Sequence, residues 1–173
     1  MSVLPVAVGF APVANPDARI LILGSLPSER SLAAGEYYAH PQNAFWAIMR
    51  ELTGAKGDYG QRCRAVTAAG IAIWDVLRQS VRPGSMDADI RLDTAQANEF
   101  ERFFAEHAKV ERVLFNGKKA EQMFARFVKT SELGKKVSFL CLPSTSPAYA
   151  AMSFADKLGH WRDALQGQSG GSA

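Results

Sequence analysis

The sequence contains only two cysteines, Cys63 and Cys141, among its 173 residues, and neither has partners at metal-ligand spacing. So small a number excludes a disulfide framework and a cysteine-based zinc or iron–sulfur site, and it favours two reduced core thiols in the cytoplasm. No run of about 18 apolar residues is present, so no membrane-spanning helix is expected. The N-terminal stretch has no basic segment and is broken by prolines, so we expect no secretion signal.

The motifs of common nucleotide-binding and hydrolytic enzymes are also missing. Neither G-x-G-x-x-G nor G-x-x-x-x-G-K-[ST] is present, and no G-x-S-x-G elbow joins an expected strand to a helix. A Ser–His hydrolase built from Ser25 or Ser144 with His40 remains an alternative, although no triad spacing supports it. The three histidines, His40, His107 and His160, form no metal pattern, and we expect neither a metal nor a cofactor.

The composition is that of an ordinary globular protein, with 47% apolar and 21% charged residues. We expect one domain over residues 1–166 and a disordered tail over 167–173. The net charge is +3 and the isoelectric point is about 9.0. A mildly basic chain permits contact with a polyanion such as nucleic acid but does not require it.

Short apolar runs alternate with helical patterns along the chain. Strands are expected at RILILG (19–24), IAIWDV (71–76), RVLFNG (112–117) and KVSFLCL (136–142). Helices are expected over 41–52, 61–70, 94–107, 118–129 and 148–165, with an irregular lead-in over 1–18 and a loop over 78–90. The alternation predicts an α/β fold, a three-layer αβα sandwich around a central, mainly parallel four-stranded sheet.

Polar segments follow all four expected strands. They read SLPSERS, DVLRQSVRPGS, NGKK and PSTSPAY, and they are rich in Ser, Pro, Gly and amides. In open parallel sheets, ligands bind beyond the carboxyl ends of the strands. The sequence therefore predicts that these four segments line a single polar pocket.

The longest of these regions, GSLPSERSLAAGEYYAHPQNAFW (24–46), gathers aromatics and amides in one place. Flat aromatic rings stack on nucleobases, and amide side chains read base edges. Ser- and Pro-rich turns present backbone N–H groups to phosphates. This combination suits an enzyme that takes a flipped base into a pocket.

The same region resembles the first motif of the uracil-DNA glycosylase superfamily, with Gly-x-x-Pro, a loop, an aromatic and then His-Pro-x-Asn-x-Phe-Trp. It is most similar to the hypoxanthine-DNA glycosylase branch (family 6, deoxyinosine glycosylases), and also to the mismatch-specific uracil/thymine glycosylases. LPSTSPAYA (142–150) resembles the second motif, which presses into the DNA minor groove. FNGKKAEQMF (115–124) resembles the intervening strand–helix turn. Together these motifs cover roughly residues 18–165, in the same order and spacing as in the superfamily.

The resemblance implies roles in a base pocket. Ser25 and Leu26 offer backbone N–H groups and the pocket floor, and Tyr38 stacks on the extruded base. Asn43 is the implied catalytic residue, whose amide oxygen holds a water below C1′ of the sugar. Asn116 faces the edge of the purine. Structural alternatives are a tight turn at Ser25 and Leu26, protein packing for Tyr38, a backbone bond for Asn43 and a turn for Asn116.

The resemblance also implies contacts with the DNA backbone. Ser144, Thr145 and Ser146 are expected to touch phosphate or the minor groove, together with Lys118. Three further cations can add phosphate contacts: Lys119, Arg78 and Arg82. Each of these cations, like Lys118, can instead be a solvated surface charge.

Asp75 and His40 are expected to have supporting roles. A carboxylate at position 75 can aid water activation or can cap the loop that follows it. His40 shapes the entry to the following helix, with a catalytic role as the alternative. Phe45 and Trp46 are predicted to be core residues.

Two positions depart from most of the superfamily. Leu26 replaces the Asn or Asp that positions the attacking water, and Leu142 replaces the His or Asn that begins the second motif. The hypoxanthine branch shares this pattern, and there the Asn that corresponds to Asn43 is implicated in catalysis.

The resemblance implies a monofunctional DNA glycosylase of base excision repair. It hydrolyses the N-glycosidic bond of deoxyinosine and leaves an abasic site, because no motif lysine predicts a Schiff base. Its expected partner is double- or single-stranded DNA with a deaminated base, and the protein is expected to be a monomer that binds no membrane. The alternatives are removal of uracil or thymine from mismatches by the same fold, a non-catalytic nucleic-acid-binding module, and a small-molecule α/β hydrolase.

Overall fold

Four parallel strands build the central sheet in the computed structural model, which describes residues 4–167. They are β2 (Ile20–Gly24), β3 (Ile71–Asp75), β6 (Arg112–Asn116) and β7 (Ser138–Leu142), in the order β3-β2-β6-β7. Every residue of β2 and β3 is buried. Strands covered on both faces need no polar alternation, which explains why they appear as continuous apolar runs in the sequence.

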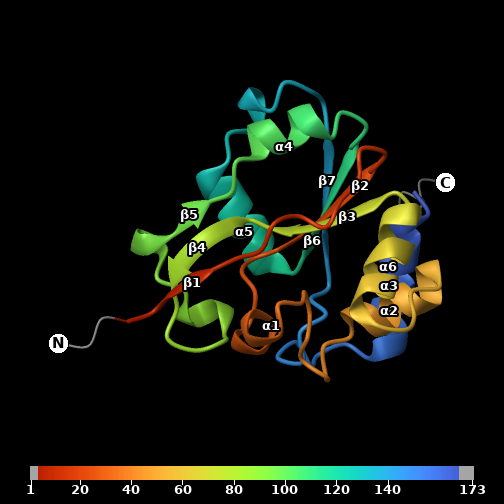
Figure 1. The fold of residues 1–173 in the computed structure, drawn as a ribbon, viewed down its shortest axis with the longest axis horizontal. Helices are drawn as coiled ribbons and strands as arrows, with labels where there is room; N and C mark the ends of the chain where they lie inside the picture. The colour runs from red at the N-terminus through yellow and green to blue at the C-terminus, as the bar shows by residue number, and fades with distance from the viewer. Residues whose placement is uncertain (1–3, 168–173) are drawn as a thin grey trace.

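Helices cover both faces of this sheet (Figure 1). One side carries α2 (Phe45–Thr53), α3 (Tyr59–Ala68) and α6 (Phe154–Leu165), and the other carries α4 (Phe100–Glu106) and α5 (Lys118–Phe127). The short helix α1 (Glu29–Ala34) follows β2. The predicted three-layer αβα sandwich with a parallel four-stranded sheet is confirmed.

Aromatic side chains fill the core on both sides of the sheet. Between β3 and α4, the Trp74 ring packs on Phe100 and Phe103 with centroid separations of 5.2 and 5.1 Å. On the opposite side, Phe45 and Trp161 are fully buried and meet edge to face. Large rings bury much apolar area per residue, so these contacts hold the helices against the strands.

A second, antiparallel sheet corrects three expectations. It consists of β1 (Val6–Val8), β4 (Leu77–Val81) and β5 (Gln96–Ala97), in the order β1-β4-β5. The lead-in is therefore not wholly irregular, residues 78–90 do not form a pure loop, and residues 95–97 are not helical. The LRQSV sequence of β4 lacks an apolar run, because only Leu77 and Ser80 of this strand are buried.

Three helices begin later than predicted. Helix α2 starts at Phe45 and not at residue 41, α4 starts at Phe100, and α6 starts at Phe154 after the cap residue Ser153. The Ser153 side chain accepts a hydrogen bond from the Asp156 N–H, which fixes the start of α6. Pro147 and the residues up to Ser153 therefore remain in an irregular loop.

Among the described residues, no helix is long and apolar enough to cross a bilayer. Of the tail expected over 167–173, residues 168–173 lie outside the described part of the chain.

Candidate active site

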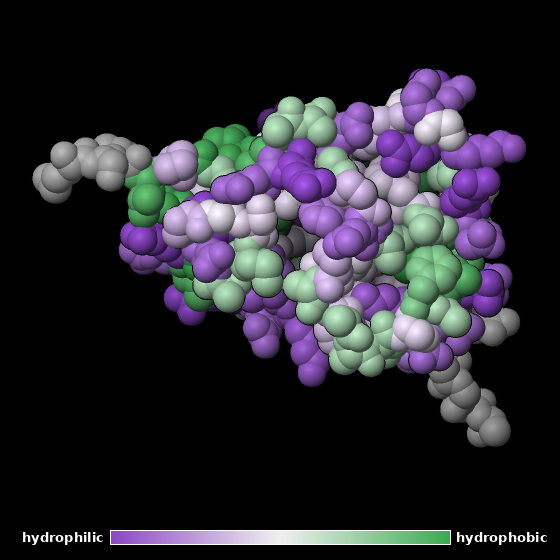
Figure 2. All heavy atoms as spheres, turned by 90° about the horizontal axis from the view of Figure 1, so that it is seen from below, coloured by the Kyte–Doolittle hydropathy of each residue, from purple (hydrophilic) through white to green (hydrophobic). Residues whose placement is uncertain are grey.

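A pocket of about 630 Å³ opens at the carboxyl ends of the four parallel strands. Its lining comes from residues 24–28 after β2, Asp75 at the end of β3, residues 116–119 after β6 and residues 144–149 after β7. Figure 2 looks onto the end of the molecule where these segments lie, and the surface is hollowed near its middle. The predicted convergence of the four strand ends on one pocket is confirmed, but the exposed lining of that pocket is more apolar than polar, which differs from the prediction.

All the residues predicted for the site lie in the lining of this pocket. The set comprises Ser25, Leu26, Tyr38, His40, Asn43, Asp75, Asn116, Lys118, Ser144, Thr145 and Ser146. Since they come from segments far apart in the sequence, the parallel sheet is what brings them together.

Asn43 lies in the turn before α2, where its carboxamide is fixed by the backbone. Its Oδ1 accepts a hydrogen bond of 2.9 Å from the Phe45 N–H, and its own N–H donates to the His40 carbonyl at 2.9 Å. These bonds hold the chain out of the helix that was predicted to include residue 43. An amide oxygen has two lone pairs, so Oδ1 retains an acceptor site. The orientation of this half-buried amide is set while part of it stays available to the pocket.

Tyr38 presents its ring to the pocket with Phe45 behind it. The two rings stack with centroids 4.0 Å apart at 26°. Tyr38 has a φ of 55°, a strained value for a bulky residue and the single positive φ of a non-glycine residue within 4–167. Its neighbour Tyr37 is instead buried, with its hydroxyl donating to the Ala11 carbonyl at 3.2 Å. Both tyrosines contribute to the lining of the pocket, and Tyr38 is the more exposed of the two.

Asn116 and Thr145 form a reciprocal pair across the pocket wall. The Asn116 Nδ2 donates to the Thr145 Oγ1, and the Thr145 N–H donates to the Asn116 Oδ1, both at 2.9 Å. Thr145 is 1% exposed, and its carbonyl also accepts from the Ala44 N–H. Its side chain is therefore turned inward, which differs from the expected contact with DNA. Asn116 has a second donor hydrogen and a second lone pair beyond this pair, and its amide also lies close to the Tyr38 hydroxyl.

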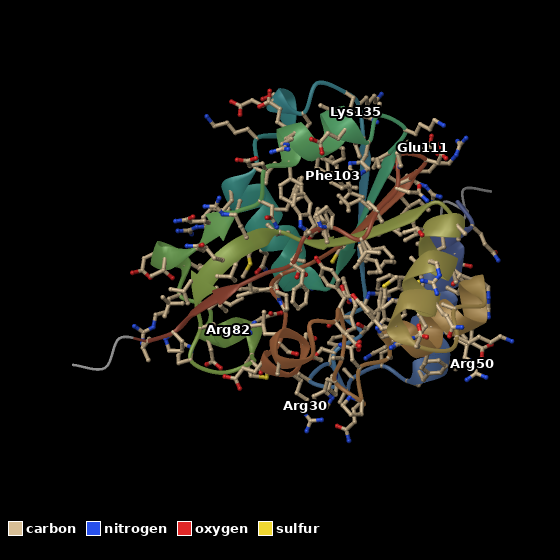
Figure 3. The ribbon with its side chains drawn as sticks, in the orientation of Figure 1. Arg30, Arg50, Arg82, Phe103, Glu111 and Lys135 are labelled. Carbon is tan, nitrogen blue, oxygen red and sulfur yellow. The ribbon has the colours of Figure 1, made fainter. Side chains whose placement is uncertain are left out.

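The loop after β2 is held in place by two side chains of the segment after β4, Arg82 and Asp87. The Ser25 hydroxyl donates to Asp87 Oδ1 at 2.5 Å. The Arg82 guanidinium donates to the carbonyls of Leu26, Pro27 and Gly84, and it lies beside this loop in Figure 3. Arg82 is 3% exposed, so its suggested phosphate contact is wrong. It fixes the shape of the pocket floor instead.

Asp75 is a buried carboxyl group at the end of β3. It is 4% exposed, and its Oδ2 has no hydrogen-bond partner within residues 4–167. Burial and the neighbouring charge of Asp87 raise the pKa of Asp75 to about 7, against a smaller opposite effect of Arg82. The Asp75 backbone carbonyl accepts a hydrogen bond from the Asn98 side chain at 2.8 Å. Asp75 therefore holds the following segment through its main chain and not through its carboxylate.

The second-motif loop and His40 form much of the pocket mouth. The Ser144 Oγ accepts from the Ser146 N–H at 3.1 Å, and the Ser146 Oγ accepts from the Ala148 N–H at 3.2 Å. His40 accepts from the Gln42 N–H through Nδ1 at 3.1 Å, a turn contact that matches its expected shaping role. Lys118 is exposed at the start of α5, where a polyanion can approach it.

Sequence reasoning gave no individual role to four residues around the pocket. Asp87 lies in the 3₁₀ turn η1 (Asp87–Asp89), next to Met86, which is 52% exposed. Tyr149 is 40% exposed at the mouth, and the buried Lys157 donates to its carbonyl at 2.7 Å. The acid-rich segment MDAD was the available signal for Asp87, but a turn between strands gives the same composition.

A family comparison matches this fold and site over almost the whole described chain. The model of the Uracil DNA glycosylase superfamily matches residues 11–166. The chain therefore belongs to the Uracil DNA glycosylase superfamily, and DNA glycosylase is the class of enzyme that its fold and pocket define.

Individual relatives agree with this assignment. A hypoxanthine DNA glycosylase from Methanosarcina barkeri is 36% identical over 115 residues, which are 65% of this chain and 72% of that protein. A second hypoxanthine DNA glycosylase, from Methanosarcina acetivorans, is 32% identical over 115 residues, which are again 65% of this chain and 72% of that protein. The solution structure of a candidate uracil DNA glycosylase from Methanosarcina acetivorans matches with a TM-score of 0.75 and 27% identity, covering 94% of this chain and 99% of that one.

Proposed function

We propose that this DNA glycosylase removes hypoxanthine from deoxyinosine in DNA. The observation that carries the proposal is the joint position of Asn43 and Tyr38 in one pocket whose Leu26 side chain is apolar. The two relatives named hypoxanthine DNA glycosylase support the same substrate. The product is free hypoxanthine and an abasic site, which base excision repair then processes.

Base binding rests on Tyr38 and Asn116. The Tyr38 ring, supported from behind by Phe45, stacks on the extruded base, a contact that gains about 1–3 kcal/mol. Asn116 keeps a donor hydrogen and a lone pair after bonding Thr145, and these can meet a purine edge. Ser25 and Leu26 form the floor beneath the base.

Catalysis rests on Asn43 as a positioning group. Its Oδ1, already oriented by the Phe45 N–H, accepts a hydrogen bond from water and holds that water toward C1′. An amide is too weak a base to remove the proton at neutral pH, so it contributes placement and electrostatic stabilisation of an oxocarbenium-like transition state. Water and not an amine is the nucleophile, which makes the enzyme monofunctional.

Leu26 argues against uracil as the main substrate. The side chain at this position positions water in uracil-removing relatives, and an aliphatic group cannot do so. Leu26 is buried, and its carbonyl accepts from Arg82, so the position serves the shape of the floor.

The setting we propose is the cytoplasm, with the enzyme acting as a monomer. Cys63 and Cys141 are both free thiols, which supports a reducing compartment.

A glycosylase assay tests the proposed function. Duplexes with a single deoxyinosine or a single uracil are incubated with the wild type, with Asn43→Ala and with Gln42→Ala, and are then cut with alkali. Gln42 is an exposed amide outside the pocket, so it is the matched control. We expect alkali-dependent cutting at deoxyinosine by the wild type and Gln42→Ala, and a loss of about 100-fold or more in Asn43→Ala. Cutting at uracil alone would refute the proposal, and binding without cutting would support a non-catalytic module.

A further inference from the structure

Two buried polar atoms lie without partners at the floor of the pocket. They are the Asp75 Oδ2 and the Tyr38 hydroxyl, and neither meets hydrogen-bond geometry with a group of residues 4–167, although the Asn116 amide lies close to the hydroxyl. Both groups approach the same point, since a Cβ atom on Gly24 would lie 2.5 Å from the Asp75 Oδ1 and 3.1 Å from the Tyr38 hydroxyl. Unpaired buried polar atoms cost free energy, so their persistence beside a ligand pocket indicates a partner that arrives with the ligand.

Burial, and after it the charges around Asp75, favour the neutral, proton-bearing form of this carboxyl group. Asp87 faces it from η1 and is a like charge, and its own Oδ1 is occupied by the Ser25 hydroxyl. Arg82 is the nearby cation, but its donors go to backbone carbonyls and not to Asp75. The remaining titratable neighbours are Tyr37 and Tyr38, whose pKa values are raised by burial and by Asp75, so both are neutral. Asp75 therefore forms no ion pair within residues 4–167, and the attraction of Arg82 is weaker than the repulsion of Asp87.

We propose that Asp75 is a catalytic acid that donates a proton to N7 of the departing purine. The proposal rests on the proposed function, because it takes deoxyinosine as the substrate. The carboxyl group lines the pocket, is more than nine-tenths buried and carries an oxygen with no other partner. The terminal torsion of an aspartate is soft, so this oxygen can turn toward a bound base at little cost.

The step balances without any further reactant. The Asp75 proton passes to N7 as the C1′–N9 bond breaks, and the bonding electron pair remains on N9. Hypoxanthine then leaves as a neutral molecule and not as an anion. The water held at Asn43 adds to C1′ of the oxocarbenium ion, and the proton that it loses returns to the Asp75 carboxylate.

This acid also defines the class of substrate. A purine offers the basic ring nitrogen N7 on the side away from its pairing edge, whereas uracil has no basic ring nitrogen to protonate. Proton donation of this kind typically contributes about 10²–10⁴-fold to a rate, and a pyrimidine in the same pocket would forgo it. The site therefore selects purines by leaving-group chemistry as well as by contact.

The test compares deoxyinosine with 7-deaza-deoxyinosine, which lacks N7, in single-turnover reactions from pH 5 to 9. Asp75→Asn preserves the size of the side chain but cannot give up a proton, and the exposed Asp93→Asn is the matched control. With deoxyinosine, we expect the wild type and Asp93→Asn to lose rate steadily above about pH 7, as the acid ionises. Asp75→Asn should be about 100-fold slower below pH 7, and its rate should not fall further above pH 7. With the 7-deaza substrate, the wild type should already be slow, and Asp75→Asn should add no further loss.

Three results separate the possible failures. If the wild type does not cut deoxyinosine at any pH, the proposed function itself is wrong. If it cuts both substrates equally well, N7 receives no proton and the role of Asp75 is overturned; this comparison uses the wild type alone and stands even if Asp75→Asn does not fold. If Asp75→Asn slows both substrates by the same factor, the residue is structural, and the inference is likewise rejected.

Discussion

Gly24 and Asp75 end neighbouring strands so closely that no side chain fits between them. The two residues are in register on β2 and β3, and a Cβ atom on Gly24 would lie 2.5 Å from the Asp75 Oδ1. The same atom would lie 3.1 Å from the Tyr38 hydroxyl. The glycine that follows the first apolar run is therefore required by the pocket and not by an unusual backbone angle.

Gly24→Ala is expected to damage both the fold and the activity. The added methyl group must displace the Asp75 carboxyl or the Tyr38 ring, and overpacking of this kind costs about 1–3 kcal/mol. Urea unfolding measures the loss of stability, and the deoxyinosine assay measures the loss of rate.

The control for Gly24→Ala is Gly159→Ala in helix α6, where an added Cβ atom meets nothing within 4 Å. Alanine has the higher helix propensity, so this variant should gain up to about 1 kcal/mol and keep its activity. A Gly24→Ala protein as stable and active as the wild type would show that the pocket floor is not tightly packed.

Burial of Asp75 makes stability depend on pH. The pKa of Asp75 is raised to about 7 in the folded state from 3.8, so between these values the folded state binds more protons than the unfolded state. Stability is therefore expected to fall as pH rises from about 4 to about 7, by up to about 4 kcal/mol from this group. Asp75→Asn has no such charge to bury, so its stability relative to the wild type should increase over the same range.

Urea unfolding at pH 5 and at pH 8 checks this dependence, with Asp93→Asn as the exposed control. A constant difference between Asp75→Asn and the wild type at both values would mean that Asp75 is already ionised in the folded protein.

The Asn116–Thr145 pair predicts unequal costs for two substitutions. Asn116→Ala removes both hydrogen bonds and leaves the Thr145 N–H without its partner, so a loss of about 2–3 kcal/mol is expected. Thr145→Val removes only the hydroxyl and keeps the bond from its N–H, so about 1 kcal/mol is expected. The midpoints of urea unfolding compare the two variants, and an equal loss in both would mean that the backbone bond contributes little.

The central sheet and the position of the site were predictable because they depend on local sequence signals. Buried parallel strands need continuous apolar runs, and the polar segments after them meet at one edge by topology alone. The second sheet was not predictable in this way. Strand β4 has the polar sequence LRQSV, and its pairing with β1 joins residues that lie far apart in the chain.

The site residues were found as a group, but their contacts were not. A run of Ser, Thr and Pro after β7 gives no indication that Thr145 turns inward, because that depends on Asn116 in another segment. Similarly, the pattern of residues 41–52 favours a helix, yet the Asn43 side chain captures the Phe45 N–H and delays its start. Such side-chain competition for backbone groups is set by tertiary structure.

Strand β2 lies between β3 and β6, so it pairs with segments that follow it by many residues. Contacts between distant segments form slowly during folding, because closing a long loop costs chain entropy before the contacts can stabilise it. The pocket has no complete wall until all four parallel strands are aligned. Recovery of base excision is therefore expected to lag behind recovery of helical signal when the unfolded chain is returned to native conditions.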